Sequence, residues 1–109
     1  MSLPIPIPES AVRRQVLDYL HALGYQVWQI ECMQYPRPAT QGVPDLFVFR
    51  KGWTGWIELK TYYKRSKRNL TQIARGDELE VEGIPYVVAR SPDDVRDWLK
   101  EHGQKTEEG

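Results

Sequence analysis

The spacing of apolar residues changes along this sequence from a helical period to a strand-like period and back. Apolar side chains recur at helical intervals over residues 9–23, and Gly24 follows where a helix would be capped. Residues 25–30 then alternate aromatic or β-branched side chains with glutamine, which is typical of a strand. Residues 46–50 are a nearly continuous apolar run, a turn that contains glycine follows, and residues 56–61 run back, so together they predict a hairpin.

The C-terminal half predicts a second helix, a buried strand and a third helix. Residues 72–82 have the spacing of a helix with one polar face, closed by Gly83. Residues 84–89 form an apolar run that is typical of a buried strand. Residues 91–94 read Ser-Pro-Asp-Asp, which places a cap, a first-turn proline and two acids at a helix start.

The resulting order, α-β-β-β-α-β-α, predicts an α/β protein with a small mixed sheet flanked by helices. With 109 residues, the chain has room for one hydrophobic core. We expect residues 1–8 to form a proline-rich arm, residues 9–102 the single domain, and residues 103–109 a flexible tail.

Composition excludes several classes of site. The one cysteine has no internal partner, and the two histidines are far apart, so a Cys/His zinc cluster is excluded and a metal would need oxygen ligands. No apolar stretch approaches the roughly 18 residues that cross a bilayer. The N-terminus lacks a basic region, and prolines interrupt its apolar residues. We therefore expect a cytoplasmic protein that does not bind membranes.

Charge is distributed unevenly although the formal net charge is zero. Residues 60–75 hold six basic residues and no acidic one, whereas residues 77–109 hold ten acidic and four basic residues. A basic strip beside an acidic flank suits a polyanion that touches one face. The alternative is a solvated loop rich in lysine and arginine.

Asp45, Glu58 and Lys60 are the residues to which the sequence points for chemistry. Asp45 follows a proline at the start of one hairpin strand. Glu58 and Lys60 lie two apart on the other strand, about 6.6 Å along it, and so share a face. Two neighbouring carboxylates suit Mg²⁺ or Mn²⁺, and an adjacent lysine can polarise a phosphate or orient water. The alternative is a cross-strand ion pair on the surface.

Five segments occur here in the order found in the PD-(D/E)xK nuclease superfamily. They are GVPDL (42–46), WIELK (56–60), the basic stretch after it, a helix opening at Gln72, and GIPYVVARS (83–91). More narrowly, residues 9–99 resemble the virus-type replication-repair nuclease (VRR-NUC) domain. The resemblance implies a restriction-endonuclease-like fold.

The resemblance also implies roles for individual residues. Asp45 and Glu58 would bind the metal, the main-chain carbonyl of Leu59 would complete its shell, and Lys60 would position the nucleophile. Glu9 would be an accessory acid and metal ligand, and Gln72 an orienting residue. Alternatively, Glu9 is an ordinary first-turn glutamate and Gln72 a polar residue near a helix start. The interval between the preceding leucine and Gln72 is shorter than the family pattern.

The basic strip supplies the expected contacts to DNA. The candidate DNA-binding residues are Lys64, Arg65, Lys67, Arg68, Arg75 and Tyr63. Aromatic rings beside basic residues can stack on unpaired bases. Trp53 is also near the hairpin, and we expect it to pack within the protein.

These observations together predict a Mg²⁺- or Mn²⁺-dependent DNA endonuclease of bacterial or phage origin, acting in DNA repair. By resemblance to small stand-alone VRR-NUC domains, we expect a homodimer that cleaves branched DNA such as four-way (Holliday) junctions or flaps. We expect no small-molecule cofactor. The alternative is an inactive nucleic-acid-binding module of the same fold.

Overall fold

A computed structural model describes residues 7–30, 40–61 and 68–109. Within these ranges the chain forms three helices and four strands in the order that the sequence predicts. They are α1 (Glu9–Ala22), β1 (Gln26–Gln29), β2 (Leu46–Arg50), β3 (Trp53–Leu59), α2 (Leu70–Val81), β4 (Tyr86–Ala89) and α3 (Pro92–Glu101).

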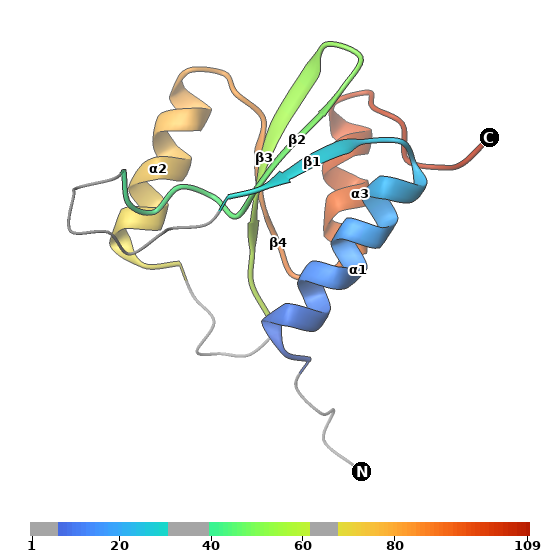
Figure 1. Ribbon diagram of the computed structural model, residues 1–109. Coiled ribbons are helices and arrows are strands. Elements are labelled where there is room, and N and C mark those ends of the chain that lie inside the picture. Colours follow the sequence, from blue (N-terminus) through green and yellow to red (C-terminus); the bar gives the residue numbers. More distant parts are fainter. Residues whose placement is uncertain (1–6, 31–39, 62–67) are drawn as a thin grey trace.

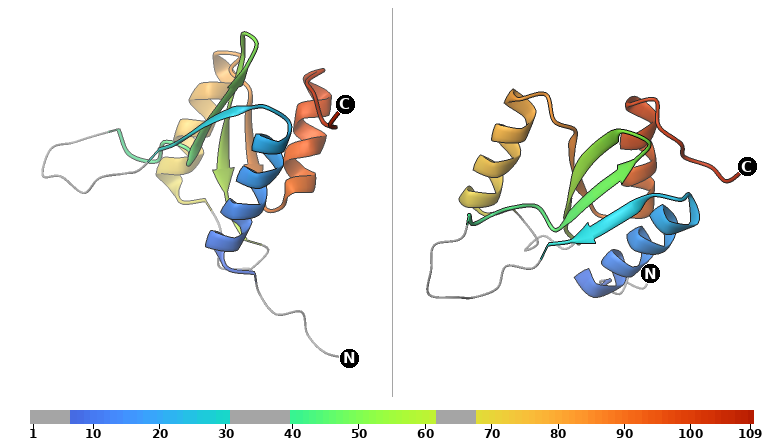
Figure 2. Two further views of the ribbon diagram at one scale, coloured as in Figure 1. Left: turned by 45° about the vertical axis from the view of Figure 1, so that its right-hand side comes forward. Right: turned by 45° about the horizontal axis from the view of Figure 1, so that its top comes forward.

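The four strands make one mixed sheet in the order β1-β2-β3-β4. The β1–β2 and β2–β3 pairs are antiparallel, whereas β4 runs parallel to β3 and leaves its other side as a sheet edge. Helices α1 and α3 lie together on one side of the sheet, and α2 lies on the other side (Figure 1, Figure 2). The predicted α/β class and mixed sheet are therefore confirmed.

The core lies between the sheet and the α1–α3 pair. Apolar residues one helical turn apart on α1 meet the inward side chains of β2 and β3, which alternate along the strands. The buried residues include Val12, Val16, Leu20, Leu46, Val48, Ile57, Leu59, Val95, Trp98 and Leu99. Ile57 and Leu59 are fully buried, so the side of β3 that carries them faces this core.

The β2–β3 turn is shorter than the sequence analysis predicts. Lys51 and Gly52 have φ angles of 48° and 84°, so these two residues alone reverse the chain, as in tight hairpins. β3 consequently begins at Trp53 rather than at residue 56. Trp53 packs within the protein as expected, with ring centroids 6.3 Å from Tyr25 and 5.2 Å from Trp98.

Gly42 brings the loop before β2 against the start of α2. Its φ is 76°, and a Cβ at this position would lie 2.6 Å from the Thr71 carbonyl carbon and 2.8 Å from the Gln72 nitrogen. Glycine therefore meets two requirements here, a left-handed backbone and a close backbone contact. The contact anchors the loop three residues before Asp45, and so helps to fix where that carboxylate lies.

The residues after α3 contact α1 and the segment between α1 and β1. The hydroxyl of Tyr19 donates to the Thr106 carbonyl and that of Tyr25 to the Lys105 carbonyl, both at 2.8 Å. The division into an arm, a domain and a tail stays a prediction. Across the described parts of the chain, the helices are too short and too polar for one to span a membrane.

We predict that Gly42→Ala destabilises the protein more than Gly52→Ala does. Both glycines have positive φ, but a Cβ on Gly52 would meet nothing within 4 Å. Gly52→Ala should therefore lose about 1 kcal/mol from backbone strain. Gly42→Ala should lose roughly a further 1–3 kcal/mol from the backbone clash. Urea unfolding of both variants measures the difference, and equal losses would contradict the contact.

Candidate active site

Asp45 and Glu58 lie opposite each other at the open end of the β2–β3 pair. Leu46 pairs with Ile57, so Asp45 and Glu58 occupy the next position in register. The Asp45 carbonyl accepts from the Ile30 N–H, and its Oδ2 accepts from the Leu59 N–H, both at 2.8 Å. These bonds fix the Asp45 backbone from one neighbouring strand and its carboxylate from the other.

Glu58 is buried although it is a carboxylic acid. Only 1% of the residue is exposed, and its Oε1 has no hydrogen-bond partner. Burial raises the pKa of Glu58 most, the hydrogen bond and negative charge of Asp45 raise it as well, and the charge of Lys60 opposes them, so that the pKa is about 9. A cation bound between the two carboxylates would favour their ionised forms.

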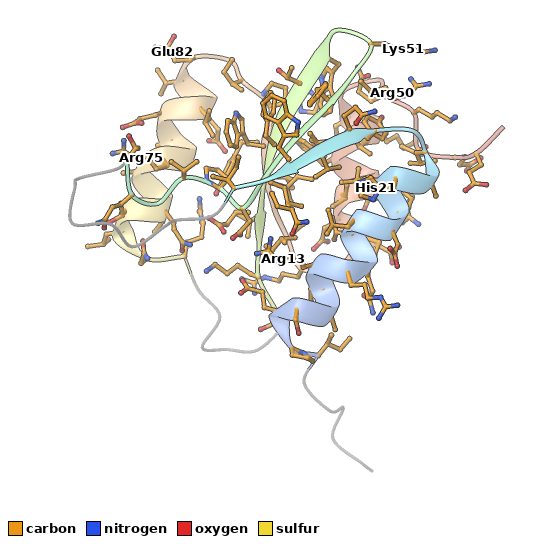
Figure 3. The ribbon with its side chains drawn as sticks, viewed as in Figure 1. Arg13, His21, Arg50, Lys51, Arg75 and Glu82 are labelled. Atoms are coloured by element: carbon orange, nitrogen blue, oxygen red, sulfur yellow. The ribbon has the colours of Figure 1, made fainter. Side chains whose placement is uncertain are left out.

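Arg13 is the cation that the structure places beside Asp45. Its Nη2 lies 3.4 Å from Asp45 Oδ1, and its Nη1 lies 3.4 Å from Gln29 Oε1 (Figure 3). No sequence pattern predicted Arg13 at the site. It lies beside the core position Val12 on α1, and helical spacing alone does not show that a long side chain reaches the sheet edge.

Lys60 continues β3 past the buried glutamate. Its N–H donates to the Ala89 carbonyl at 2.9 Å, so the residue is held to β4. The side chain is half-buried, and its charge acts on the pKa of Glu58. The three core residues of the predicted motif, Asp45, Glu58 and Lys60, are therefore neighbours. Leu59 lies between the last two, and its side chain is fully buried in the core.

The donor set fits a hard divalent cation. Two carboxylates meet at one point, and a buried oxygen of one of them lacks a partner. Mg²⁺ and Mn²⁺ favour such oxygen ligands and keep several of their waters. Within the described ranges, no three His, Cys, Asp or Glu side chains are grouped closely enough to bind a metal. A cation at Asp45 and Glu58 would therefore complete its shell with carbonyl, water or substrate oxygens.

Glu9 and Gln72 lie in the first turns of helices α1 and α2, whereas Asp45 and Glu58 lie on the β2–β3 pair. Glu9 is exposed in the first turn of α1, although its charge acts on the pKa of Glu58. Gln72 makes a capping box with Asn69. Its N–H donates to Asn69 Oδ1 at 2.8 Å, and its Oε1 accepts from the Asn69 N–H at 3.0 Å. That box accounts for Gln72 as a residue of the helix start.

The predicted DNA-binding residues fall in different places. Arg68 is half-buried before α2, and its Nη1 lies 3.4 Å from the Tyr86 hydroxyl. Arg75 pairs with Glu78 at 3.1 Å on α2, well apart from Arg13 (Figure 3). Four further candidates lie outside the described residues. They are Tyr63, Lys64, Arg65 and Lys67.

We predict that Glu58→Gln stabilises the metal-free protein above about pH 5. The pKa of Glu58 rises from 4.5 in the unfolded chain to about 9 in the folded protein. Between those values the folded state holds a proton that the unfolded state has lost, so stability falls as pH rises.

Glutamine removes that linkage, and the gain at neutral pH should be roughly 1–3 kcal/mol. Thermal unfolding in a chelator at several pH values measures it. Glu80→Gln, at an exposed position of α2, is the control. A wild-type stability that does not fall between pH 5 and 9 relative to Glu58→Gln would contradict the assignment.

No family model matches the sequence, and no curated protein matches it either. The structure is similar to a solved structure described as a VRR_NUC domain, with a TM-score of 0.66 and 25% sequence identity. The match covers 86% of this chain and 95% of that one. The chain thus has the nuclease-type fold of the VRR_NUC domain, the family that its sequence resembles.

Proposed function

We propose that this protein is a Mg²⁺- or Mn²⁺-dependent endonuclease that hydrolyses phosphodiester bonds in DNA. The observation that carries the proposal is the buried Glu58 beside Asp45, with one oxygen unpartnered and with Lys60 next along the strand. Burying an unpaired carboxyl group is costly in folding, so the arrangement is understandable as a site built for a cation. The similarity to a VRR_NUC domain supports the same chemistry.

Asp45 and Glu58 would hold the cation, and the main-chain carbonyl of Leu59 would complete its shell. A bound divalent cation makes water more acidic and stabilises charge on a phosphoryl group. The Leu59 N–H fixes one oxygen of Asp45, and Arg13 contacts the other. Lys60 would orient the attacking water or neutralise charge on the scissile phosphate. Glu58 would have to release its proton to solvent in order to hold a cation, because carboxylate ligands must be ionised.

Arg68 and the basic strip before it would bind the DNA backbone. This proposal covers Lys64, Arg65, Lys67 and Arg68, with Tyr63 as a stacking residue. Of these five residues, the structure describes Arg68, and its side chain lies beside Tyr86 of β4. Arg75 remains a proposed DNA-binding residue, and its guanidinium also pairs with Glu78 on α2. Gln72 remains a proposed orienting residue, and its amide oxygen also takes part in the capping box. Glu9 remains a proposed accessory acid.

We further propose a homodimer that acts on branched DNA. The sheet carries a row of touching aromatic rings, with centroids 4.8–5.6 Å apart, at Trp28, Phe47, Phe49 and Trp56. Trp28 is 59% exposed on the edge strand β1. Phe47, Phe49 and Trp56 are half-buried beside it, and aromatic residues are enriched at protein interfaces. Two copies joined at this face would present two active sites to a substrate with more than one duplex arm.

We predict that Asp45→Asn and Glu58→Gln each lower the cleavage rate by roughly 100-fold or more while the protein stays folded. The assay compares linear duplex, flap, fork and four-way substrates, with Mg²⁺, with Mn²⁺ and with a chelator. Glu80→Gln is the matched control on an exposed part of α2. Wild-type protein that binds these substrates without cutting any of them would instead identify an inactive binding module.

We predict that Trp28→Ala weakens the dimer by at least about tenfold, since a large aromatic residue at an interface is a common hot spot. Sedimentation equilibrium over a range of concentrations measures the dissociation constant. Leu70→Ala is the control, because Leu70 is 85% exposed but lies at the start of α2, away from the aromatic row. A wild-type monomer would overturn the dimer, and an unaffected Trp28 variant would overturn this interface.

A further inference from the structure

A cavity of about 680 Å³ runs along β4, the strand at the sheet edge. Its lining comes from the start of α2, from β4 and from α3. β4 pairs with β3 in register, with Trp56 opposite Tyr86 and Glu58 opposite Val88. Paired residues share a face of the sheet, so part of the cavity lies on the face that carries Glu58.

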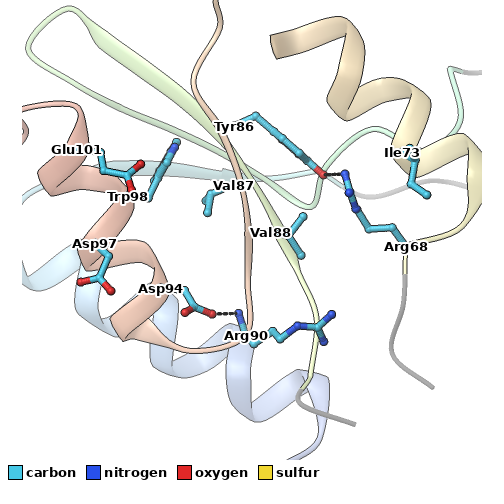
Figure 4. A pocket seen from close by; sticks show the side chains of 10 residues that line it. All are labelled: Arg68, Ile73, Tyr86, Val87, Val88, Arg90, Asp94, Asp97, Trp98 and Glu101. Carbon is cyan, nitrogen blue, oxygen red and sulfur yellow. Dashed lines mark hydrogen bonds between the residues drawn. The ribbon is translucent and has the colours of Figure 1, made fainter. Parts of the chain in front are cut away.

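The two sides of β4 differ in charge. Figure 4 shows Arg68 and Arg90 on one side of the strand, and Asp94, Asp97 and Glu101 on the other. A polyanion is attracted to the first side and repelled from the second. The cavity therefore presents a path for an anionic chain on the arginine side alone.

Arg90 follows β4 at the position next to Lys60. Leu59 pairs with Ala89, so Lys60 and Arg90 are the next residues in register. The Arg90 guanidinium donates to the carbonyl of Thr61, which follows Lys60. A guanidinium has five N–H donors in a planar fork, so one arginine can hold a carbonyl and a phosphate together.

Arg68 is held at the other end of the same side. Its Nη1 contacts the Tyr86 hydroxyl, and the Tyr86 ring seats against α2 at Gly76, where a Cβ would lie 2.7 Å from the ring. Burial raises the pKa of Tyr86, Arg68 lowers it, and the charge of Glu58 raises it, so Tyr86 lies within electrostatic range of the carboxylate pair. The Arg68 side chain is thereby positioned close to the candidate active site.

We propose that the arginine side of this cavity binds backbone phosphate of the cut DNA strand beside the scissile phosphate. Arg68 and Arg90 are the phosphate-binding residues, and Tyr86 is a positioning residue for Arg68. The proposal rests on the proposed nuclease function and adds a site to it, because Arg90 lies outside the basic strip of residues 60–75. The acidic side, on α3, keeps the strand from crossing β4.

Binding is measured in the Asp45→Asn background, so that the DNA stays intact. Arg68→Ala and Arg90→Ala should each raise the dissociation constant roughly tenfold. Each should also lower the slope of log K against log salt by about 0.7 for a single strand or 0.9 for duplex. Tyr86→Phe should have a smaller effect in the same direction. The matched control is Arg96→Ala, because Arg96 on α3 pairs with Asp93 and Asp97 and should not move the slope.

Substrates with one neutral methylphosphonate at a time, placed at successive phosphates around the cut site, locate the contact. At one or more positions beside the scissile phosphate, the neutral group should weaken DNA binding by the protein that keeps both arginines. The same substitution in the DNA should not weaken binding by the Arg68→Ala, Arg90→Ala double variant. This test remains valid even if Arg90→Ala destabilises the protein, because the loss of DNA affinity at each neutral position is first measured on the protein that keeps both arginines. Absence of any such position would overturn the proposal.

Failure of the proposed function has a different signature. If the wild type cuts no substrate with any divalent cation, the nuclease proposal fails whatever the arginine variants do. If the wild type cuts DNA but both arginine variants keep its salt slope and its methylphosphonate profile, the phosphate site alone is overturned.

Discussion

The antiparallel pairing of β2 with β3 is the constraint on which the candidate site depends. It brings Asp45 opposite Glu58, although the two residues are thirteen positions apart in sequence. The same register buries Ile57 and Leu59 in the core. A slip of one residue would move these apolar side chains to the other face and separate the carboxylates. Core packing and the tight turn at Lys51–Gly52 therefore hold the chemistry in place.

Most of the fold and the central residues of the site could be predicted from the sequence, because local patterns determine them. Helical spacing in α1, alternation in β3 and the caps of α3 each depend on nearby residues. The turn was misjudged because Trp53–Gly55 contains a glycine and resembles a loop, whereas Gly55 serves to make room for Trp98, whose ring would lie 2.5 Å from a Cβ there. That contact joins residues more than forty positions apart.

What could not be predicted from the sequence is how distant elements meet around Glu58. A strand pattern shows that Glu58 points away from Ile57 and Leu59, and that side is usually solvated. Its burial depends on how residues distant in sequence pack around β3, which lies between β2 and β4 in the sheet. The approach of Arg13 from α1 and of Arg90 from β4 depends likewise on tertiary packing. Neither arginine lies in the run of positive charge that the sequence makes conspicuous.

The distribution of charge around the sheet also explains how a protein with zero net charge can accommodate DNA. Arg13 and Lys60 lie beside the carboxylate pair and Arg68 and Arg90 line the neighbouring cavity, whereas acidic residues cluster on α3 and on the last turns of α2. Opposite charges on separate surfaces cancel in the total but not in the field near each surface. On the proposed function, the two acidic surfaces would confine a DNA strand to the strip of sheet that holds Asp45 and Glu58. The two carboxylates alone would repel a phosphate, and the nearby cationic side chains, together with a divalent metal if one binds there, would supply the attraction that the carboxylates lack.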